Sequence, residues 1–212
     1  GHPMPAGYLD QATALAREHG LAVHLDGARV FNAAVAAGGD PYTALRGIVD
    51  RFDSVSVCFS KGLGAPVGSA LCGSKDLIRR ALRWRKMLGG GLRQAGVLAA
   101  AGSYALQHHV RRLADDHANL DRLAQGLAEA NRSHPVLKDK ITVLPWQTNI
   151  LFTDLHTEVA PAFTAWLAQH GVRVTSSLYG GATRLRWVTH LDVSEADVTA
   201  ALDCVARFTL PG

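Results

Sequence analysis

The chain has 212 residues, of which 48% are hydrophobic and 19% charged, and its formal net charge is +4. This balance is typical of a globular protein and differs from that of a disordered chain. No apolar run reaches the length of a membrane span, and no stretch resembles a signal peptide, so neither a membrane nor a secreted setting is expected.

The three cysteines, Cys58, Cys72 and Cys204, lack the spacing of a metal site. Cys58 and Cys72 fall in apolar strand patterns and are expected to pack in the core. Few cysteines without a pairing pattern favour a reducing, cytoplasmic setting.

The positive charge is concentrated in one short region rather than spread along the chain. No aromatic interleaving or nucleic-acid motif accompanies this region, so nucleic acid is not an expected partner. A solvated helix face is one interpretation, because several of these side chains follow helical spacing. A small anionic ligand such as a phosphate or a carboxylate is the interpretation that we favour. The basic residues are Arg79, Arg80, Arg83, Arg85, Lys86 and Arg93.

In chain order, the first half alternates strand and helix patterns. This alternation predicts βαβ units and a parallel sheet. Asp40 followed by Pro41 predicts a helix start, with aspartate as the cap. The expected elements are a helix over 9–19, a strand over 21–25, a helix over 28–37, a short helix from 40, and strands over 54–59 and 68–73.

The second half is richer in helices and ends as a small α+β domain. We expect residues 1–115 to form part of a large domain, and residues 116–212 to hold a bridging helix and the small domain. The alanine-rich helix over 92–108 should be buried or lie at a subunit interface, because it is nearly uncharged. The expected elements are helices over 74–88, 92–108 and 111–130, a polar segment over 131–145 that marks the domain boundary, a strand over 148–153, a helix over 159–170, strands over 172–175 and 183–189, and a helix over 194–208.

The strand pattern of residues 54–59 leads to Lys61, which is followed by several glycines. Gly62, Gly64 and Gly68 leave room for a bulky planar group near the lysine amine. Ligands of open α/β sheets usually bind at the carboxyl ends of strands, and burial there would favour the neutral, nucleophilic form of the amine. For this lysine taken alone, a solvated loop position is the better-supported alternative.

Asp26 ends one predicted strand as Lys61 ends another, so both should reach the same edge of the sheet. A carboxylate beside an amine nucleophile can hold a ring nitrogen protonated, as in pyridoxal phosphate sites that pair a Schiff-base lysine with an aspartate. The alternative role of Asp26 is the N-cap of the next helix, which is at least as common. Arg29 is expected to project from the first turn of that helix.

Competing motifs are weak. The glycine-rich loop over 62–68 has the wrong spacing for a dinucleotide loop, and a strand pattern rather than a helix follows it. The histidines lack the spacing of a zinc site, and the chain has neither a Walker A motif nor Gly-x-Ser-x-Gly. The sequence therefore predicts no metal site and gives a hydrolase no support.

Four separated blocks of the sequence are informative together, namely His24–Arg29, Ser54–Gly68, Trp84–Gly96 and Arg186–His190. They resemble the low-specificity L-threonine aldolases, which belong to the fold type I, aspartate-aminotransferase-like group of pyridoxal phosphate enzymes. They follow the family's order over nearly the whole chain, which is far more specific than one motif. The resemblance implies an α/β fold, in which the C-terminal part of a fold type I large domain, with a mostly parallel sheet, precedes a small α+β domain. It also implies a homo-oligomer, a dimer of dimers in the family.

The resemblance assigns the cofactor, pyridoxal 5′-phosphate, to four residues. Lys61 resembles the lysine that forms the Schiff base, and Asp26 resembles the aspartate that keeps the pyridine nitrogen protonated. Arg93 resembles an arginine that reaches the phosphate, from a neighbouring subunit in one interpretation. Lys86 resembles a second basic residue near the site.

Arg29 and Arg186 resemble the pair that binds the carboxylate of the amino-acid substrate, a task that suits bidentate guanidinium groups. Arg184 shares a strand face with Arg186, so spacing alone does not separate them. The resemblance favours Arg186 because it stands in the matching block. The implied reaction is retro-aldol cleavage of L-threonine or L-allo-threonine to glycine and an aldehyde, with the preference between the two substrates left open.

The family's chain has a further N-terminal part, with a phosphate cradle and two histidines that have no counterpart here. The general base is therefore not assigned. One alternative is a catalytically incomplete fragment that acts as a structural or subunit-interacting remnant, and another is a related fold type I β-eliminating lyase. Retention of the lysine, aspartate and arginines favours an aldolase over a remnant, and the block over 84–96 favours it over the lyase. We expect the isolated chain to aggregate or fold weakly, because sheet edges and the helix over 92–108 would be uncovered.

Overall fold

The computed structural model describes residues 1–176 and 183–210. The chain divides into two compact units. The N-terminal unit has residues 3–114, and the C-terminal unit has residues 115–212 and also includes residues 1–2. Each unit has its own sheet and its own buried core. Among the described residues, no helix combines the length and apolar character that a bilayer crossing requires.

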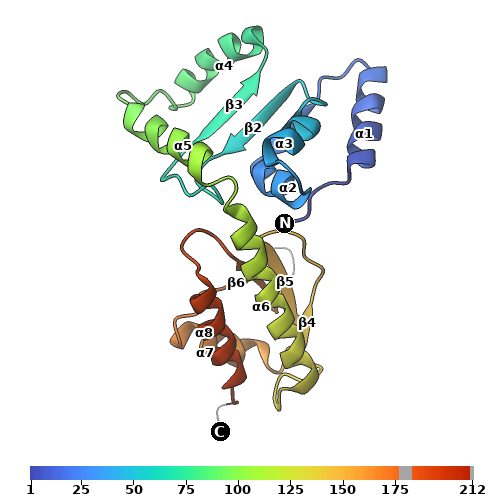
Figure 1. Ribbon diagram of the computed structural model, residues 1–212, viewed down its shortest axis with the longest axis vertical. Coiled ribbons are helices and arrows are strands. Elements are labelled where there is room, and N and C mark those ends of the chain that lie inside the picture. Colours follow the sequence, from blue (N-terminus) through green and yellow to red (C-terminus); the bar gives the residue numbers. More distant parts are fainter. Residues whose placement is uncertain (177–182, 211–212) are drawn as a thin grey trace. The chain divides into compact units, whose positions relative to one another are not determined.

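The N-terminal unit is built on a sheet with the strand order β1-β2-β3. β1 and β2 are parallel, and β2 and β3 are antiparallel. The parallel character that we expected therefore applies to the first pair only, because a short loop joins β2 to β3 and a parallel pair needs a longer crossover. Figure 1 labels the elements of this unit except β1. The elements are α1 (Ala6–Glu18), β1 (His24–Gly27), α2 (Val30–Ala36), α3 (Pro41–Val49), β2 (Ser54–Cys58), β3 (Ser69–Gly73), α4 (Lys75–Met87) and α5 (Gly96–His108).

Local signals fix several helix starts in this unit. The Asp40 carboxylate accepts a hydrogen bond from the Thr43 N–H at 2.9 Å, and Pro41 is the first helical residue, as predicted. Compared with the predicted strand over 21–25, β1 begins three residues later and ends two residues later, so that it includes Asp26. α5 begins at Gly96 rather than at residue 92, because Gln94 adopts a φ of 50° that no helix contains.

The core of the N-terminal unit lies around β1, β2 and α2, and it leaves α4, β3 and most of α5 exposed. α4 has no buried residue, and α5 buries only Gly102 and Ala105. Of the two alternatives expected for the helix over 92–108, burial within this chain is not observed, and a subunit interface stays a prediction. The expected uncovered apolar surface is present. The most exposed apolar side chains of α4, α5 and the loop between them form what we call the α4–α5 surface. They are Met87, Leu88, Leu92 and Val97.

The cysteines depart in part from the expected core packing. Cys72 of β3 is exposed and Cys58 of β2 is half-buried, whereas Cys204 is buried. All three thiols are free. The apolar pattern of β3 predicted the strand correctly, but its burial depends on a covering layer that the described residues do not supply.

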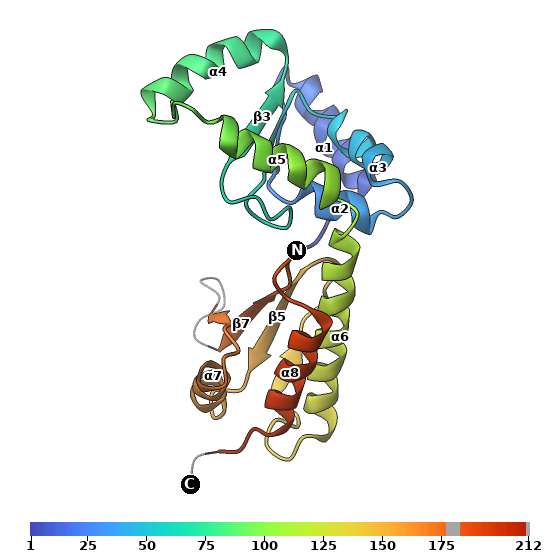
Figure 2. The same ribbon diagram turned by 60° about the vertical axis from the view of Figure 1, so that its left-hand side comes forward.

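The C-terminal unit carries an antiparallel sheet with the strand order β4-β5-β7-β6. β4 falls in the segment that we expected to be a polar connection. β6 begins at Thr175, the last residue of the strand predicted over 172–175. Figure 2 shows α6 and α8 side by side in this unit, which agrees with an ion pair between Arg122 and Glu195. The elements are α6 (Leu113–Ser133), β4 (Ile141–Val143), β5 (Ile150–Leu155), α7 (Ala160–Gln169), β6 (Thr175–Ser176), β7 (Arg184–Val188) and α8 (Glu195–Ala206).

The helices α6, α7 and α8 pack in one core against the sheet. Gly126 of α6 has no side chain, which lets Leu202 of α8 pack closely against the helix. The strand burial alternates, so Leu185 and Trp187 of β7 enter the core. The intervening residues, Arg184 and Arg186, lie on the other face of the sheet and are half-buried.

Candidate functional site

The parallel pair β1–β2 brings two of the predicted site residues to one edge of the N-terminal sheet. Asp26 is paired in register with Ser56, and β2 ends at Cys58, three residues before Lys61. Both Asp26 and Lys61 are exposed. The described residues give neither side chain an ion-pair partner, so an amine and a carboxylate are available at the carboxyl ends of neighbouring strands.

Asp26 does not cap the helix that follows it. Its Oδ1 accepts a hydrogen bond from the Ala28 N–H at 3.1 Å, which closes a short turn after β1. α2 begins only at Val30, with Arg29 in the cap position. Asp26 is therefore not the N-cap of α2, and only one of its two carboxylate oxygens takes part in the turn.

The turn that carries Lys61 is closed by backbone hydrogen bonds. The Gly64 N–H donates to the Lys61 carbonyl and the Ala65 N–H to the Phe59 carbonyl, both at 2.9 Å. Gly64 has a φ of 71° and Gly68 a φ of 114°, so these glycines serve the backbone of the loop itself. Lys61 is exposed rather than buried, which corrects our expectation that burial in this chain would activate its amine.

The same turn packs tightly against two neighbouring elements. A Cβ atom on Gly62 would lie 2.9 Å from Leu113 Cδ2 and 3.0 Å from Asn32 Oδ1. Arg29, at the start of α2, lines a small crevice together with Gly62. The structure therefore places one of the predicted carboxylate-binding arginines beside the lysine turn.

Two residues of this site were missed from the sequence. Asn32 is 3% exposed and packs on Gly62, and its polar side chain in the apolar run of α2 was an available signal. His109 Nδ1 lies 2.6 Å from the Leu63 carbonyl oxygen. No local pattern indicates that contact, because the two residues are 46 positions apart in the sequence.

Cys58 lies at the end of β2, near the lysine. Burial raises the pKa of the Cys58 thiol, but hydrogen bonding with Ser60 and the positive charge of Lys61 outweigh it and hold the pKa below its ordinary value.

Lys86 and Arg93 are not part of the β1–β2 edge. Lys86 lies in the last turn of α4, and Arg93 lies in the loop between α4 and α5. The Lys86 side chain folds over Gly91, where an added Cβ would lie 2.6 Å from Lys86 Cδ. Arg93 is exposed. Neither residue has a hydrogen bond or ion pair with Lys61 or Asp26 in the described part of the chain, so their cofactor roles remain predictions.

In the C-terminal unit, the two arginines of β7 differ in their contacts. Arg184 makes two hydrogen bonds to Asp154, from Nε to Oδ1 and from Nη2 to Oδ2, each of 2.6 Å. Hydrogen bonding from Arg184 lowers the pKa of Asp154 below its ordinary value and raises the pKa of Arg184. Arg186 has no ion-pair partner among the described residues, which leaves its guanidinium available for a carboxylate.

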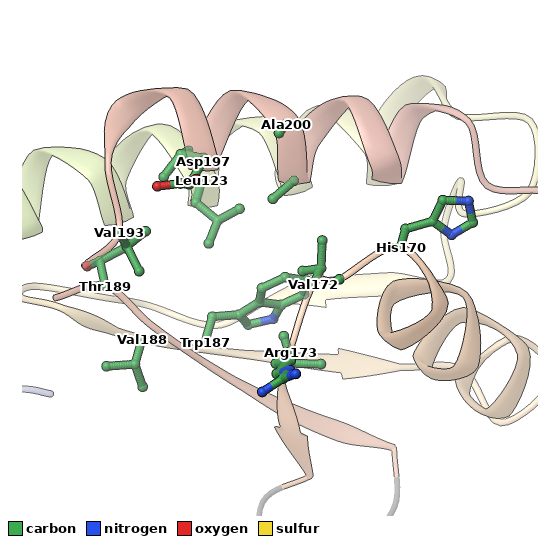
Figure 3. A pocket seen from close by; sticks show the side chains of 14 residues that line it. Leu123, His170, Val172, Arg173, Trp187, Val188, Thr189, Val193, Asp197 and Ala200 are labelled. Atoms are coloured by element: carbon green, nitrogen blue, oxygen red, sulfur yellow. The ribbon is translucent and has the colours of Figure 1, made fainter. Parts of the chain in front are cut away.

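A cavity of about 330 Å³ lies on the other face of the same sheet, between β7 and α8. Figure 3 shows the Trp187 ring in the cavity, with Ala200 on the side of α8 and Arg173 near its edge. Arg186 follows the opposite face of β7, so this cavity does not belong to the predicted carboxylate site. The carboxylate of Asp197 is already engaged by the N–H and hydroxyl of Ser194.

The residues at the β1–β2 edge fit two groups of pyridoxal phosphate, its aldehyde and its ring nitrogen. An exposed primary amine can bond to the aldehyde, and an exposed carboxylate without an ion-pair partner can face the ring nitrogen. No group of three or more potential metal ligands occurs among residues 1–176 and 183–210.

Comparison with known families adds an independent observation. The family described as "Beta-eliminating lyase" matches residues 1–148, which is more than half of the chain. The chain belongs to this family. The match covers every predicted site residue of the N-terminal unit and ends before Arg186.

Several curated relatives of this chain are named as threonine aldolases. The low specificity L-threonine aldolase of Escherichia coli strain K12 is 45% identical over 194 residues, covering 92% of this chain and 53% of the relative. Low-specificity L-threonine aldolase 1 of Arabidopsis thaliana is 37% identical over 213 residues, covering 99% of this chain and 56% of the relative. The resemblance stated from the four blocks is confirmed. The chain spans about half the length of the curated relatives that it matches.

Solved structures agree on the fold. The threonine aldolase of Leishmania major superposes with a TM-score of 0.74 at 21% identity, covering 98% of this chain and 57% of the other. At that identity the likeness shows the fold alone. It confirms the expected α/β fold of the fold type I group.

Proposed function

We propose that the protein is a pyridoxal-phosphate-dependent aldolase that cleaves L-threonine and L-allo-threonine to glycine and acetaldehyde. The observation that carries the proposal is the placement of Asp26 and Lys61 at the carboxyl ends of the neighbouring parallel strands β1 and β2, where both side chains are exposed. The names of relatives that are 37% and 45% identical support the same activity.

Lys61 would hold the cofactor through its amine, and Asp26 would keep a proton on the ring nitrogen. When bound, pyridoxal phosphate supplies an electron sink that stabilises negative charge at the substrate Cα. Lys86 and Arg93 are the proposed basic residues for the phosphate end, and Arg93 would act from a neighbouring subunit.

Arg29 and Arg186 would bind the substrate carboxylate and so fix the orientation of the Cα–Cβ bond. In the cleavage, the β-hydroxyl loses its proton and becomes the aldehyde oxygen, the Cα–Cβ bond breaks, and Cα gains a proton. One molecule of L-threonine gives one of glycine and one of acetaldehyde. Of the two arginines of β7, Arg184 is paired with Asp154, whereas Arg186 has no ion-pair partner among the described residues. This difference supports Arg186 as the substrate ligand.

We also propose that the protein works in the cytoplasm as a homo-oligomer, a dimer of dimers. The exposed α4–α5 surface supports association with another chain, because exposed apolar patches commonly mark protein interfaces. The three free cysteines are consistent with a reducing compartment.

A product assay tests the proposed reaction. The chain is incubated with pyridoxal phosphate and L-threonine, and glycine, acetaldehyde, ammonia and 2-oxobutanoate are measured together. The proposal predicts glycine and acetaldehyde in equal amounts, and a rate at least about 1,000-fold lower in Lys61→Ala, because the covalent anchor is lost. Lys75→Ala, at the exposed start of α4, is the matched control. Ammonia with 2-oxobutanoate would instead indicate β-elimination, and equal rates in Lys61→Ala would contradict the role of the lysine.

A further inference from the structure

We propose that His109 is a positioning residue for Lys61. It stands at the C-terminal end of α5 and fixes the turn that carries the lysine by donating a hydrogen bond to the Leu63 carbonyl. This inference rests on the proposed function, because it concerns the reach of the Lys61 amine toward its cofactor.

The geometry of the contact determines which group donates. Nδ1 of His109 lies 2.6 Å from the Leu63 oxygen. A carbonyl oxygen only accepts hydrogen bonds, so Nδ1 carries the proton. The neutral Nδ1–H tautomer and the doubly protonated ring both provide this donor, and the bond does not require a particular charge on the ring.

The imidazole is itself held in place. The His109 N–H donates to the Ala105 carbonyl at 2.8 Å, which continues the hydrogen bonding of α5 into the cap residue. The Tyr104 ring meets the His109 ring edge to face, with centroids 5.5 Å apart and an interplanar angle of 83°. Ala105 is 1% exposed, so the last turn of α5 is anchored in the core. The donor is therefore presented from a fixed element.

The acceptor belongs to the lysine turn. Leu63 is 3% exposed and packs in the core of the N-terminal unit. The same turn is closed by the Gly64 N–H to the Lys61 carbonyl, and on its other side Gly62 packs against Asn32. His109 and Asn32 thus hold the turn from α5 and α2.

The Lys61 side chain depends on this turn for its position. The described residues provide no hydrogen bond or ion pair to its amine, and it is exposed. The backbone at Lys61 therefore sets the point from which the side chain leaves the turn, and with it the space that the amine can reach. Loss of the His109 donor would leave the carbonyl of a buried residue without that partner and would widen the range of turn conformations.

A pair of amide variants tests this role. His109→Asn keeps an N–H donor at the δ position, whereas His109→Gln moves it one carbon further, to where Nε2 stood. His108→Gln is the matched control, since His108 is the exposed neighbour that stacks on Tyr104. Two readouts are taken in the 212-residue chain. One is amide hydrogen exchange at Gly64, and the other is the initial rate of borohydride-trapped pyridoxyl labelling of Lys61, relative to Lys75 in the same sample.

We expect His109→Gln to speed exchange at Gly64 and to lower the relative labelling rate of Lys61 about tenfold, the size expected for one lost hydrogen bond. His109→Asn should restore both readouts to within about threefold of the wild type, and His108→Gln should leave them unchanged. Equal behaviour of the Asn and Gln variants would overturn the inference. If the wild type shows no preference for Lys61 while Gly64 exchange still separates Asn from Gln, the proposed function fails and the positioning of the turn stands.

Discussion

Arg184 and Asp154 form a two-bond ion pair across β7 and β5, and Arg186, two residues further along the same face, has no such partner among the described residues. Sequence spacing gave the two arginines equal standing. The structure distinguishes them, because a guanidinium already bound to a carboxylate is not free to bind a second one without losing the first. The preference for Arg186 as the substrate ligand thus gains a physical reason.

The first prediction concerns these two arginines. Arg186→Gln should raise KM for L-threonine by about 10- to 100-fold, the size expected when a charged hydrogen-bonding partner of the substrate is removed. Arg184→Gln should leave KM within about threefold of the wild type. Steady-state kinetics with acetaldehyde detection measures both. A larger KM effect in Arg184→Gln than in Arg186→Gln would reverse the assignment.

The second prediction concerns acid stability. Hydrogen bonding from Arg184 lowers the pKa of folded Asp154, so the pair stabilises the fold above the unfolded pKa of about 4, and this contribution is lost as the pH falls through the folded value. Since both side chains are about one-third exposed, the contribution should stay below about 1 kcal/mol. Thermal unfolding of Asp154→Asn should show a lower Tm than the wild type at pH 7, and the difference should shrink at about pH 3. A difference that grows on acidification would contradict the sign.

The third prediction concerns the packing of the lysine turn. Gly62→Ala should destabilise the chain by about 1–3 kcal/mol, because its Cβ would press on Leu113 and Asn32. Gly47→Ala is the matched control in α3, where an added Cβ meets nothing within 4 Å. It should stabilise the chain by about 0.4–1 kcal/mol through the unfolded state. Denaturant unfolding measures both free energies, and equal effects of the two variants would be inconsistent with the packing.

The fourth prediction concerns the α4–α5 surface. Val97 is 76% exposed, and we expect the chain to self-associate through this apolar region. Val97→Lys should reduce the mean mass measured by light scattering at the same protein concentration. Leu15→Lys, at an exposed position of α1, adds the same charge elsewhere and serves as control. A monomeric wild type with a sharp, cooperative thermal transition would count against this expectation.

Local chemistry accounts for the parts of the fold that the sequence predicted well. The Asp40 and Ser74 caps each accept a hydrogen bond from the backbone N–H three residues later, and such pairs are visible in the sequence. The positions of Asp26 and Lys61 at strand ends follow equally from the apolar runs that precede them. These features depend on neighbours in the chain.

Features that depend on distant partners could not be predicted in the same way. The three-residue strand β4 pairs with β5, and its β-branched run Ile-Thr-Val was too short to be separated from the polar segment around it. The contact of His109 with Leu63 joins two segments 46 residues apart. Cys72 was expected in the core, but the burial of a strand depends on the layer that covers it. The choice between Arg184 and Arg186 needed the position of Asp154 on the neighbouring strand.

The most direct test of the central claim is to map where pyridoxal phosphate attaches. The chain is mixed with the cofactor, reduced with borohydride, digested, and analysed by mass spectrometry for pyridoxyl-lysine. The account predicts one dominant adduct on Lys61, with little on Lys75, Lys86, Lys138 or Lys140. Labelling spread evenly over these five lysines, or absent from Lys61, would contradict the assignment of Lys61 as the residue that holds the cofactor.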